Sequence, residues 1–137
     1  MKRTLLIATA TGMLALAGLV HAAETPATNW QKGLSRTDLV RQDLGAADRE
    51  VIQARVDFAP GVTSPKHAHP GVEVAYVISG TFEYQLEGRA PVTLNAGQSL
   101  LIPAGVAHVA KNIGAGEGSE LATYVVEKGQ PLLLLKQ

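Results

Sequence analysis

The chain contains no cysteine. Disulfide bonds, thiolate nucleophiles and cysteine-ligated metal sites are therefore excluded, and the fold must be stabilised by its core and by any bound metal. Lysine and arginine form no run, and the 12 basic residues are balanced by 12 acidic ones. Without a basic patch, we expect no nucleic-acid partner. The sequence also lacks internal repeats and low-complexity tracts, and its length fits a single domain.

The one extended apolar run lies at the N-terminus. It follows Lys2 and Arg3 and ends in a small-residue cleavage site after Ala22. This is the pattern of a secretory signal peptide. The run is shorter than the roughly 20 residues that a membrane-spanning helix needs. We therefore expect a signal peptide over residues 1–22, a periplasmic or secreted mature protein, and no membrane contact after cleavage.

Beyond this segment the apolar residues follow the two-residue period of β-strands. In VIQARVDF, residues 51–58, apolar and polar side chains alternate. Only residues 37–50 leave room for a short helical turn. Further strands are expected, separated by turn-forming residues, over residues 72–79, 81–87, 91–95, 98–103, 106–112 and 121–128, with 132–135 as a candidate for the last.

At least seven short strands in about 100 residues predict an all-β fold, either a small antiparallel β-barrel or a double-sheet jelly roll. We expect residues 23–48 to form an N-terminal arm with a first short strand. Residues 49–137 should then form the β-barrel domain.

Three histidines remain once the signal peptide is set aside, namely His67, His69 and His108. Because His67 and His69 are one residue apart, they point to the same face of an extended strand, and Glu73 has the same parity. Two imidazoles and a carboxylate on one face can direct their ligand atoms at a single metal ion. A histidine taken singly is more often a surface or core residue.

Two spaced motifs surround these residues. The first is G-x5-H-x-H-x3-E-x6-G, from Gly61 to Gly80, and the second is G-x5-P-x-G-x2-H-x3-N, from Gly97 to Asn112. Together they resemble the two motifs of the cupin superfamily at every defining position, with the short spacing of small single-domain bacterial cupins. The resemblance implies a cupin β-barrel, and Asn112 is expected to have a structural role.

The resemblance also implies a metal centre. Its ligands would be His67, His69, Glu73 and His108. Three nitrogens and one oxygen suit Fe, Mn, Ni, Cu or Zn, and the sequence does not choose among these ions. Glu73 has two expected roles, as a ligand and as a candidate base that leaves the metal during catalysis.

Strand parity predicts the surroundings of this centre. Ala75 and Val77 share the inward face with Glu73, so a small-walled, apolar cavity is expected. The nearest basic residues, Arg55 and Lys66, have the wrong parity to enter it. For Phe82, Tyr84 and Tyr124, packing in the core is expected more than lining the cavity. The outward Val74, Tyr76 and Ile78 and the apolar segment 131–135 predict a homodimer interface.

An apolar pocket around a redox-capable metal favours a metal-dependent enzyme that acts on a small organic molecule with O2, a dioxygenase resembling the quercetinase-like cupins. Two alternatives stay open. One is an isomerase or hydrolase that uses the metal as a Lewis acid, as other cupins do. The other is a non-catalytic module that binds a metal or a small molecule, in which the metal can be purely structural.

Overall fold

The computed structural model describes residues 28–137, so the predicted signal peptide lies outside the described residues. These residues contain 11 strands and no helix, and hence no helix that is long and apolar enough to cross a membrane. The strands are β1 (Thr28–Gln31), β2 (Leu34–Asp43), β3 (Arg49–Phe58), β4 (His67–Ala68), β5 (Val72–Ser79), β6 (Thr81–Leu86), β7 (Val92–Asn95), β8 (Ser99–Ile102), β9 (His108–Asn112), β10 (Gly118–Glu127) and β11 (Leu134–Leu135).

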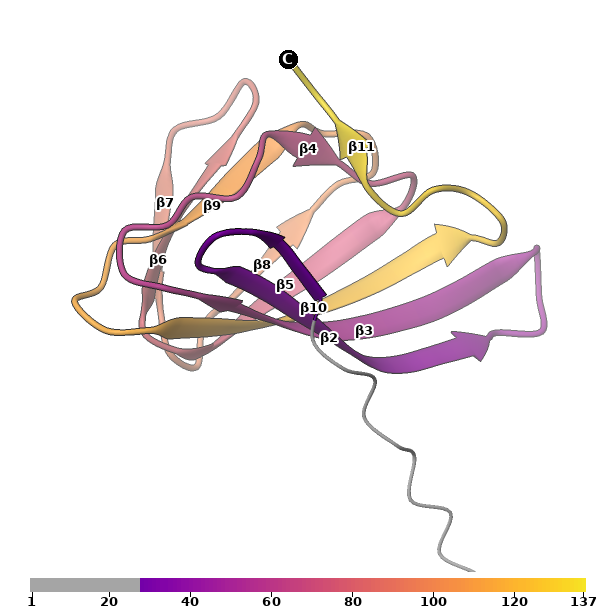
Figure 1. Cartoon of the computed structure of the whole chain (residues 1–137). Coiled ribbons are helices and arrows are strands. Elements are labelled where there is room, and N and C mark those ends of the chain that lie inside the picture. The colour runs from indigo at the N-terminus through magenta and orange to yellow at the C-terminus, as the bar shows by residue number, and fades with distance from the viewer. Residues whose placement is uncertain (1–27) are drawn as a thin grey trace, which may run out of the picture.

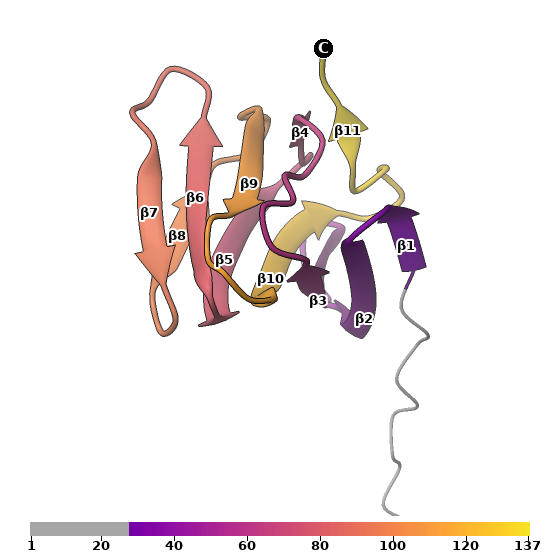
Figure 2. The same cartoon turned by 60° about the vertical axis from the view of Figure 1, so that its left-hand side comes forward.

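The strands form two antiparallel sheets that pack face to face (Figure 1, Figure 2). One sheet has six strands in the order β1-β2-β3-β10-β5-β8, and the other has five in the order β11-β4-β9-β6-β7. Strands that lie side by side in a sheet are often far apart in the sequence, as when β10 lies between β3 and β5. This is a jelly-roll-like arrangement, and the all-β fold predicted from the sequence is confirmed.

The short helical turn for which residues 37–50 left room does not form. Strand β2 continues to Asp43, and β3 begins at Arg49 after a tight turn in which Ala47 and Asp48 have φ of 50° and 51°. Strand β2 pairs with β3 along most of its length, so ladder hydrogen bonds determine its conformation and outweigh a weak local preference. Residues 28–43, which belong to the segment expected as an arm with one short strand, form two strands of the six-stranded sheet.

The core lies between the sheets and follows the predicted alternation. On β3 the side chains of Ile52, Ala54, Val56 and Phe58 are buried, and on β5 those of Ala75 and Val77. Phe58 contacts Phe82 of the opposite sheet edge to face, with ring centroids 5.0 Å apart. Such aromatic pairs add to the free energy gained from burial alone. The two sheets are therefore held together by interdigitating apolar side chains.

The outer face of the six-stranded sheet is also apolar around β5. Val74, Tyr76 and Ile78 are about 40 % exposed, as their parity predicted, and Leu101 of β8 lies beside Val74 in the ladder. Solvent-facing apolar side chains gathered in one place are characteristic of interaction surfaces.

The end of β9, the strand that carries His108, is fixed by Asn112. This side chain is fully buried, and its Nδ2 donates hydrogen bonds to the carbonyl oxygens of Phe58 (3.0 Å), Ala59 (3.3 Å) and Gly116 (2.8 Å). Its Oδ1 accepts a hydrogen bond from the backbone N–H of Gly114 at 2.9 Å. Asn112 therefore ties one sheet to the end of β3 in the other.

Replacing Asn112 with alanine should destabilise the fold, because the buried carbonyl oxygen of Phe58 and the partly buried ones of Ala59 and Gly116 lose their donor. We expect the Asn112→Ala variant to lose about 2–4 kcal/mol of unfolding free energy, measured by chemical denaturation. The control is Asn95→Ala, since the exposed Asn95 accepts a single hydrogen bond from the Thr81 hydroxyl. An equal loss in the two variants would contradict the role given to Asn112.

The predicted homodimer can be tested on the outer face of β5. A Val74→Lys, Tyr76→Lys double variant places two charges on the apolar face, so a dimer formed there should dissociate to monomers in light-scattering measurements coupled to gel filtration. Arg89→Glu, in the exposed turn between β6 and β7, serves as the charge-change control and should leave the mass unaltered. A monomeric wild-type protein, or a dimer that survives the double variant, would refute this interface.

Candidate metal centre

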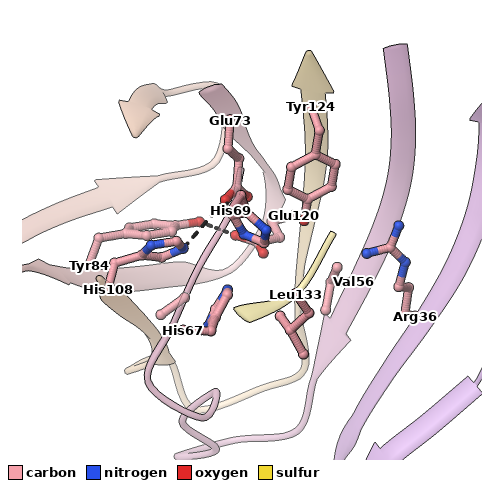
Figure 3. A pocket seen from close by; sticks show the side chains of 11 residues that line it. Arg36, Val56, His67, His69, Glu73, Tyr84, His108, Glu120, Tyr124 and Leu133 are labelled. Carbon is pink, nitrogen blue, oxygen red and sulfur yellow. Dashed lines mark hydrogen bonds and ion pairs between the residues drawn. The ribbon is translucent and has the colours of Figure 1, made fainter. Parts of the chain in front are cut away.

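Two sheets contribute the candidate ligands. His67 begins β4 and pairs directly with His108 at the start of β9, in the five-stranded sheet. His69 follows β4, and Glu73 lies on β5 of the other sheet. The structure brings the four residues predicted from the sequence into one place, with their side chains directed toward one another (Figure 3).

The three imidazoles form a compact group. Their ligand nitrogens lie within 4.8 Å of one another, close enough to hold one metal ion after small side-chain rotations. Glu73 completes the group, because its Oε2 lies 3.0 Å from His69 Nε2 and 3.4 Å from His108 Nε2. Three nitrogens and a carboxylate oxygen therefore converge.

Each imidazole is oriented by a backbone carbonyl. The Nδ1 atoms of His67, His69 and His108 lie 2.7, 2.7 and 3.0 Å from the carbonyl oxygens of Pro65, Leu132 and Val106, respectively. A carbonyl oxygen can only accept a hydrogen bond, so Nδ1 carries the proton in all three rings. In the neutral rings Nε2 then presents a lone pair to the centre, as a metal ligand does.

In this arrangement the unprotonated ring nitrogens and the Glu73 carboxylate, all hydrogen-bond acceptors, face one another. Within residues 28–137, His69 Nε2 and Glu73 Oε2 are buried side-chain atoms without a hydrogen-bond partner, and they face each other. Leaving such groups unpaired in the interior costs free energy. A cation between them would satisfy both, so the residues fit a bound metal ion.

The charge states also suit a metal. Burial, together with the nearby His108, lowers the pKa of His67 to about 4, so this ring is neutral at pH 7. Burial opposes the charge of Glu73, but the adjacent His108 and His69 rings outweigh it and lower the carboxyl pKa to about 2. A neutral imidazole and an ionised carboxylate are the forms that bind metal. Although burial disfavours the charged His108 ring, Glu73 raises its pKa, so a proton can occupy this position when no metal is bound.

The C-terminal segment takes part in the centre. Strand β11 pairs with β4, placing Leu134 opposite Ala68 and Leu135 opposite His67. The Leu132 carbonyl accepts the His69 hydrogen bond, and Leu133 lines the pocket. The apolar segment that the sequence suggested as part of a dimer interface thus covers and orients the metal centre.

The centre opens into a pocket of about 390 Å³, including solvent at its mouth. The pocket was expected to be apolar, and this is wrong. Its apolar walls are Val56, Ala110 and Leu133, and its polar lining, besides the four candidate ligands, consists of Arg36, Tyr84, Glu120 and Tyr124. The predicted inward residues Ala75 and Val77 are buried in the core and do not line it.

Glu120 is a pocket residue that the sequence analysis missed. It is buried on β10 and accepts a hydrogen bond from the Tyr84 hydroxyl. Burial, and then the negative charge of Glu73, raise the pKa of Glu120 to about 8. Strand parity could have placed Glu120 on the inward face, because it shares the parity of Ala122 and Tyr124. It was missed because an acidic residue is unexpected on the buried face of a strand.

Arg36 is the second residue that was missed. It lies on β2, in the segment expected as an N-terminal arm with one short strand, and its side chain is only 11 % exposed. Arg55 and Lys66, the basic residues considered from the sequence, are both absent from the pocket lining.

Comparison with known proteins identifies related chains. A family model described as "Cupin domain" matches residues 54–130. Germin-like protein subfamily 2 member 2 of Arabidopsis thaliana is 36 % identical over 110 residues, which cover 67 % of this chain and 50 % of that protein. Oxalate oxidase GF-3.8 of Triticum aestivum is 34 % identical over 106 residues, covering 71 % of this chain and 47 % of that protein. The chain spans about half the length of these curated relatives.

Solved structures show the same fold. KdgF from Halomonas sp. superposes with a TM-score of 0.64 at 20 % identity, covering 77 % of this chain and 89 % of that one. An oxalate oxidase in complex with the substrate analogue glycolate superposes with a TM-score of 0.60 at 25 % identity, covering 75 % of this chain and 55 % of that one.

Metal analysis tests the centre directly. We expect protein purified without a histidine tag to contain close to one equivalent of a transition metal by elemental analysis, and the His69→Ala variant to contain almost none. Loss of an outer hydrogen-bond partner alone costs roughly 10–100-fold in metal affinity, and loss of a ligand costs more. Glu87→Ala, which removes an exposed carboxylate, is the control. A wild-type protein that stays metal-free after reconstitution would contradict the site.

Proposed function

Because this chain belongs to the cupin family, we propose that it is a metal-dependent oxidoreductase that uses O2 to oxidise a small polar organic molecule. The observation that carries the proposal is that the convergent ligands His67, His69, His108 and Glu73 line an open pocket. Structural metal sites are closed by protein ligands, whereas catalytic sites keep a position for water or substrate.

The donor set supports a redox-active ion. Imidazole nitrogens with one carboxylate oxygen suit Fe, Mn, Ni or Cu, and also Zn, which has no redox chemistry. When bound, a redox-active ion would supply the electron transfer that couples substrate oxidation to O2 reduction. The relatives named as oxalate oxidases agree with such chemistry, although they share only part of their length with this chain.

The protein side chains have separable roles. Glu73 is better suited to ligation than to the role of mobile base, because its Oε2 lies within 3.4 Å of two ligand nitrogens and is fully buried among them. Glu120 is the other carboxyl group of the pocket. It is held by the Tyr84 hydroxyl and is free of the ligand nitrogens, so it can hydrogen-bond to a substrate bound beside the metal.

The residues that line the pocket limit the range of candidate substrates. A flavonol, as used by quercetinase-like cupins, would need a broad apolar cavity, and this pocket carries an arginine, a glutamate and two tyrosines. The enclosed space is small, since the room for water-sized groups among the lining side chains is about 20 Å³ and much of the remaining volume is open to solvent. We therefore favour a small polar substrate over a flavonol.

Oxygen consumption tests the proposal. Metal-reconstituted protein is mixed with oxalate, glycolate, small hydroxy and keto acids, catechols, diketones and flavonols, and O2 uptake is followed with an electrode. We expect uptake with a small polar substrate, at a rate reduced at least about a hundredfold in His108→Ala because the metal is lost. Protein loaded with Zn is the matched control and should consume no O2.

Two other outcomes have defined meanings. Turnover of a substrate without O2 uptake, equally with Zn and with a redox-active ion, would replace the proposal by Lewis-acid isomerase or hydrolase chemistry. Metal binding with no turnover of any compound would favour a non-catalytic binding module.

A further inference from the structure

One of the three imidazoles is oriented by a distant part of the chain. The carbonyl oxygens that accept from His67 and His108 belong to residues two positions earlier in the sequence, so the local backbone orients these two rings. The carbonyl oxygen that accepts from His69 belongs to Leu132, 63 residues away, and lies 2.7 Å from Nδ1. The position of the proton on His69 therefore depends on the docking of the C-terminal segment.

Residues 131–137 form a C-terminal strap that few contacts hold in place. Its strand β11 has two residues and pairs with β4 at the edge of the five-stranded sheet (Figure 2). The backbone N–H of Lys136 donates to the Lys66 carbonyl oxygen at 2.9 Å, and the Lys66 ammonium donates to the Gln137 backbone oxygen at 3.3 Å. The Leu132 side chain packs against a buried apolar cluster on β3 and β10. Segments with so few buried contacts open locally more readily than central strands do.

With the strap docked, His69 is held in the form that binds a metal ion. The Leu132 carbonyl can only accept a hydrogen bond, so Nδ1 carries the proton and Nε2 presents a lone pair. Nε2 lies 3.0 Å from Glu73 Oε2, and neither atom has a hydrogen-bond partner within residues 28–137. Two facing acceptors without a partner cost free energy, and a bound ion removes that cost.

With the strap released, the same ring can adopt its other tautomer. The His69 side chain is buried while the strap is docked, but after release its Nδ1 would face water, which can donate a hydrogen bond to it. The proton can then reside on Nε2, whose 3.0 Å separation from Glu73 Oε2 suits an N–H···O hydrogen bond. This tautomer satisfies both atoms without an ion, and it removes the lone pair that a metal needs.

We propose that the C-terminal strap sets the tautomer of His69, so that docking of the strap and binding of the metal ion stabilise each other. The docked state has the hydrogen bond to the Leu132 carbonyl, and the released state has a hydrogen bond to Glu73 in its place. A ligand that binds one of two states more tightly shifts the population toward that state. This coupling requires the metal centre but not the proposed O2 chemistry.

A matched pair of variants tests the coupling. The variant Leu132→Ala, Lys136→Pro removes a packed side chain and a backbone donor of the strap and leaves every candidate ligand in place. The control Leu135→Ala, Lys136→Ala shortens exposed side chains of the same segment and keeps the backbone donor. In a competition with a chelator, we expect the first variant to bind Zn roughly tenfold or more weakly, as after loss of an outer hydrogen-bond partner, and the control to match the wild type.

Nitrogen-15 NMR of the histidine rings separates a change of tautomer from general destabilisation. In metal-free protein we expect His69 of the first variant to populate the Nε2–H form, whereas His67 and His108 keep the Nδ1–H form. These two rings are internal references, because their carbonyl partners lie outside the strap. An Nδ1–H ring at His69 in the metal-free first variant, or wild-type affinity for Zn in that variant, would overturn the proposal.

The reciprocal measurement uses the wild-type protein, so it stands even where a variant fails to fold. Because coupling acts in both directions, Zn should slow amide hydrogen exchange in the strap, with the Lys136 amide as the probe. The reference is the Gln98 amide, bonded to the Asn95 carbonyl in the turn between β7 and β8, at the end of the molecule opposite β11 (Figure 2). Exchange at Lys136 that is no more sensitive to Zn than exchange at Gln98 would refute the coupling.

Discussion

The rest of the site depends on a group of buried hydrogen-bond acceptors that face one another. Three backbone carbonyls take the Nδ1 protons of His67, His69 and His108, so each neutral ring directs a lone pair inward, where Glu73 adds a carboxylate oxygen. Among the described residues, His69 Nε2 and Glu73 Oε2 have no hydrogen-bond partner where these acceptors meet. A bound cation would satisfy both atoms, and the ligand set is chemically suited to a transition metal. The backbone carbonyls thus decide which ring nitrogen carries the proton and which one faces the centre of the site.

The two-sheet fold explains how such a group can form. His67 and His108 lie on neighbouring strands of the five-stranded sheet, His69 directly follows the first of these strands, and Glu73 lies on the six-stranded sheet, so the site spans the two layers. Asn112 ties the far end of the His108 strand to β3, and β11 covers the His67 strand. An ion bound there would cross-link the layers, and in a chain without disulfides this cross-link would add to core packing. The proposed ion would thus contribute both to the stability of the fold and to the function of the site.

Local rules account for most of the strands, because alternation has a period of two residues, and it correctly separated buried from exposed side chains along β3 and β5. The candidate ligands converge as the two spaced motifs predicted. They do not share one strand face, because His67 lies on β4 of one sheet and Glu73 on β5 of the other. Long-range register explains what was missed. Arg36 and Glu120 enter the pocket because β2, β3 and β10 are neighbours, and Leu132 reaches His69 because the C-terminal strand pairs with β4. None of these pairings can be read from spacing within one segment.

A purely structural metal does not account for the polar residues that line the pocket. If the ion had a purely structural role, we would expect apolar side chains to enclose it, since buried charges without a partner cost free energy. Instead Glu120, held by Tyr84, and Arg36, held by Asp38, line the same open pocket. Tyr124 lies between the arginine and the histidines, in contact with both. A polar lining of this kind fits a polar small molecule beside the ion better than an ion that only cross-links the two sheets.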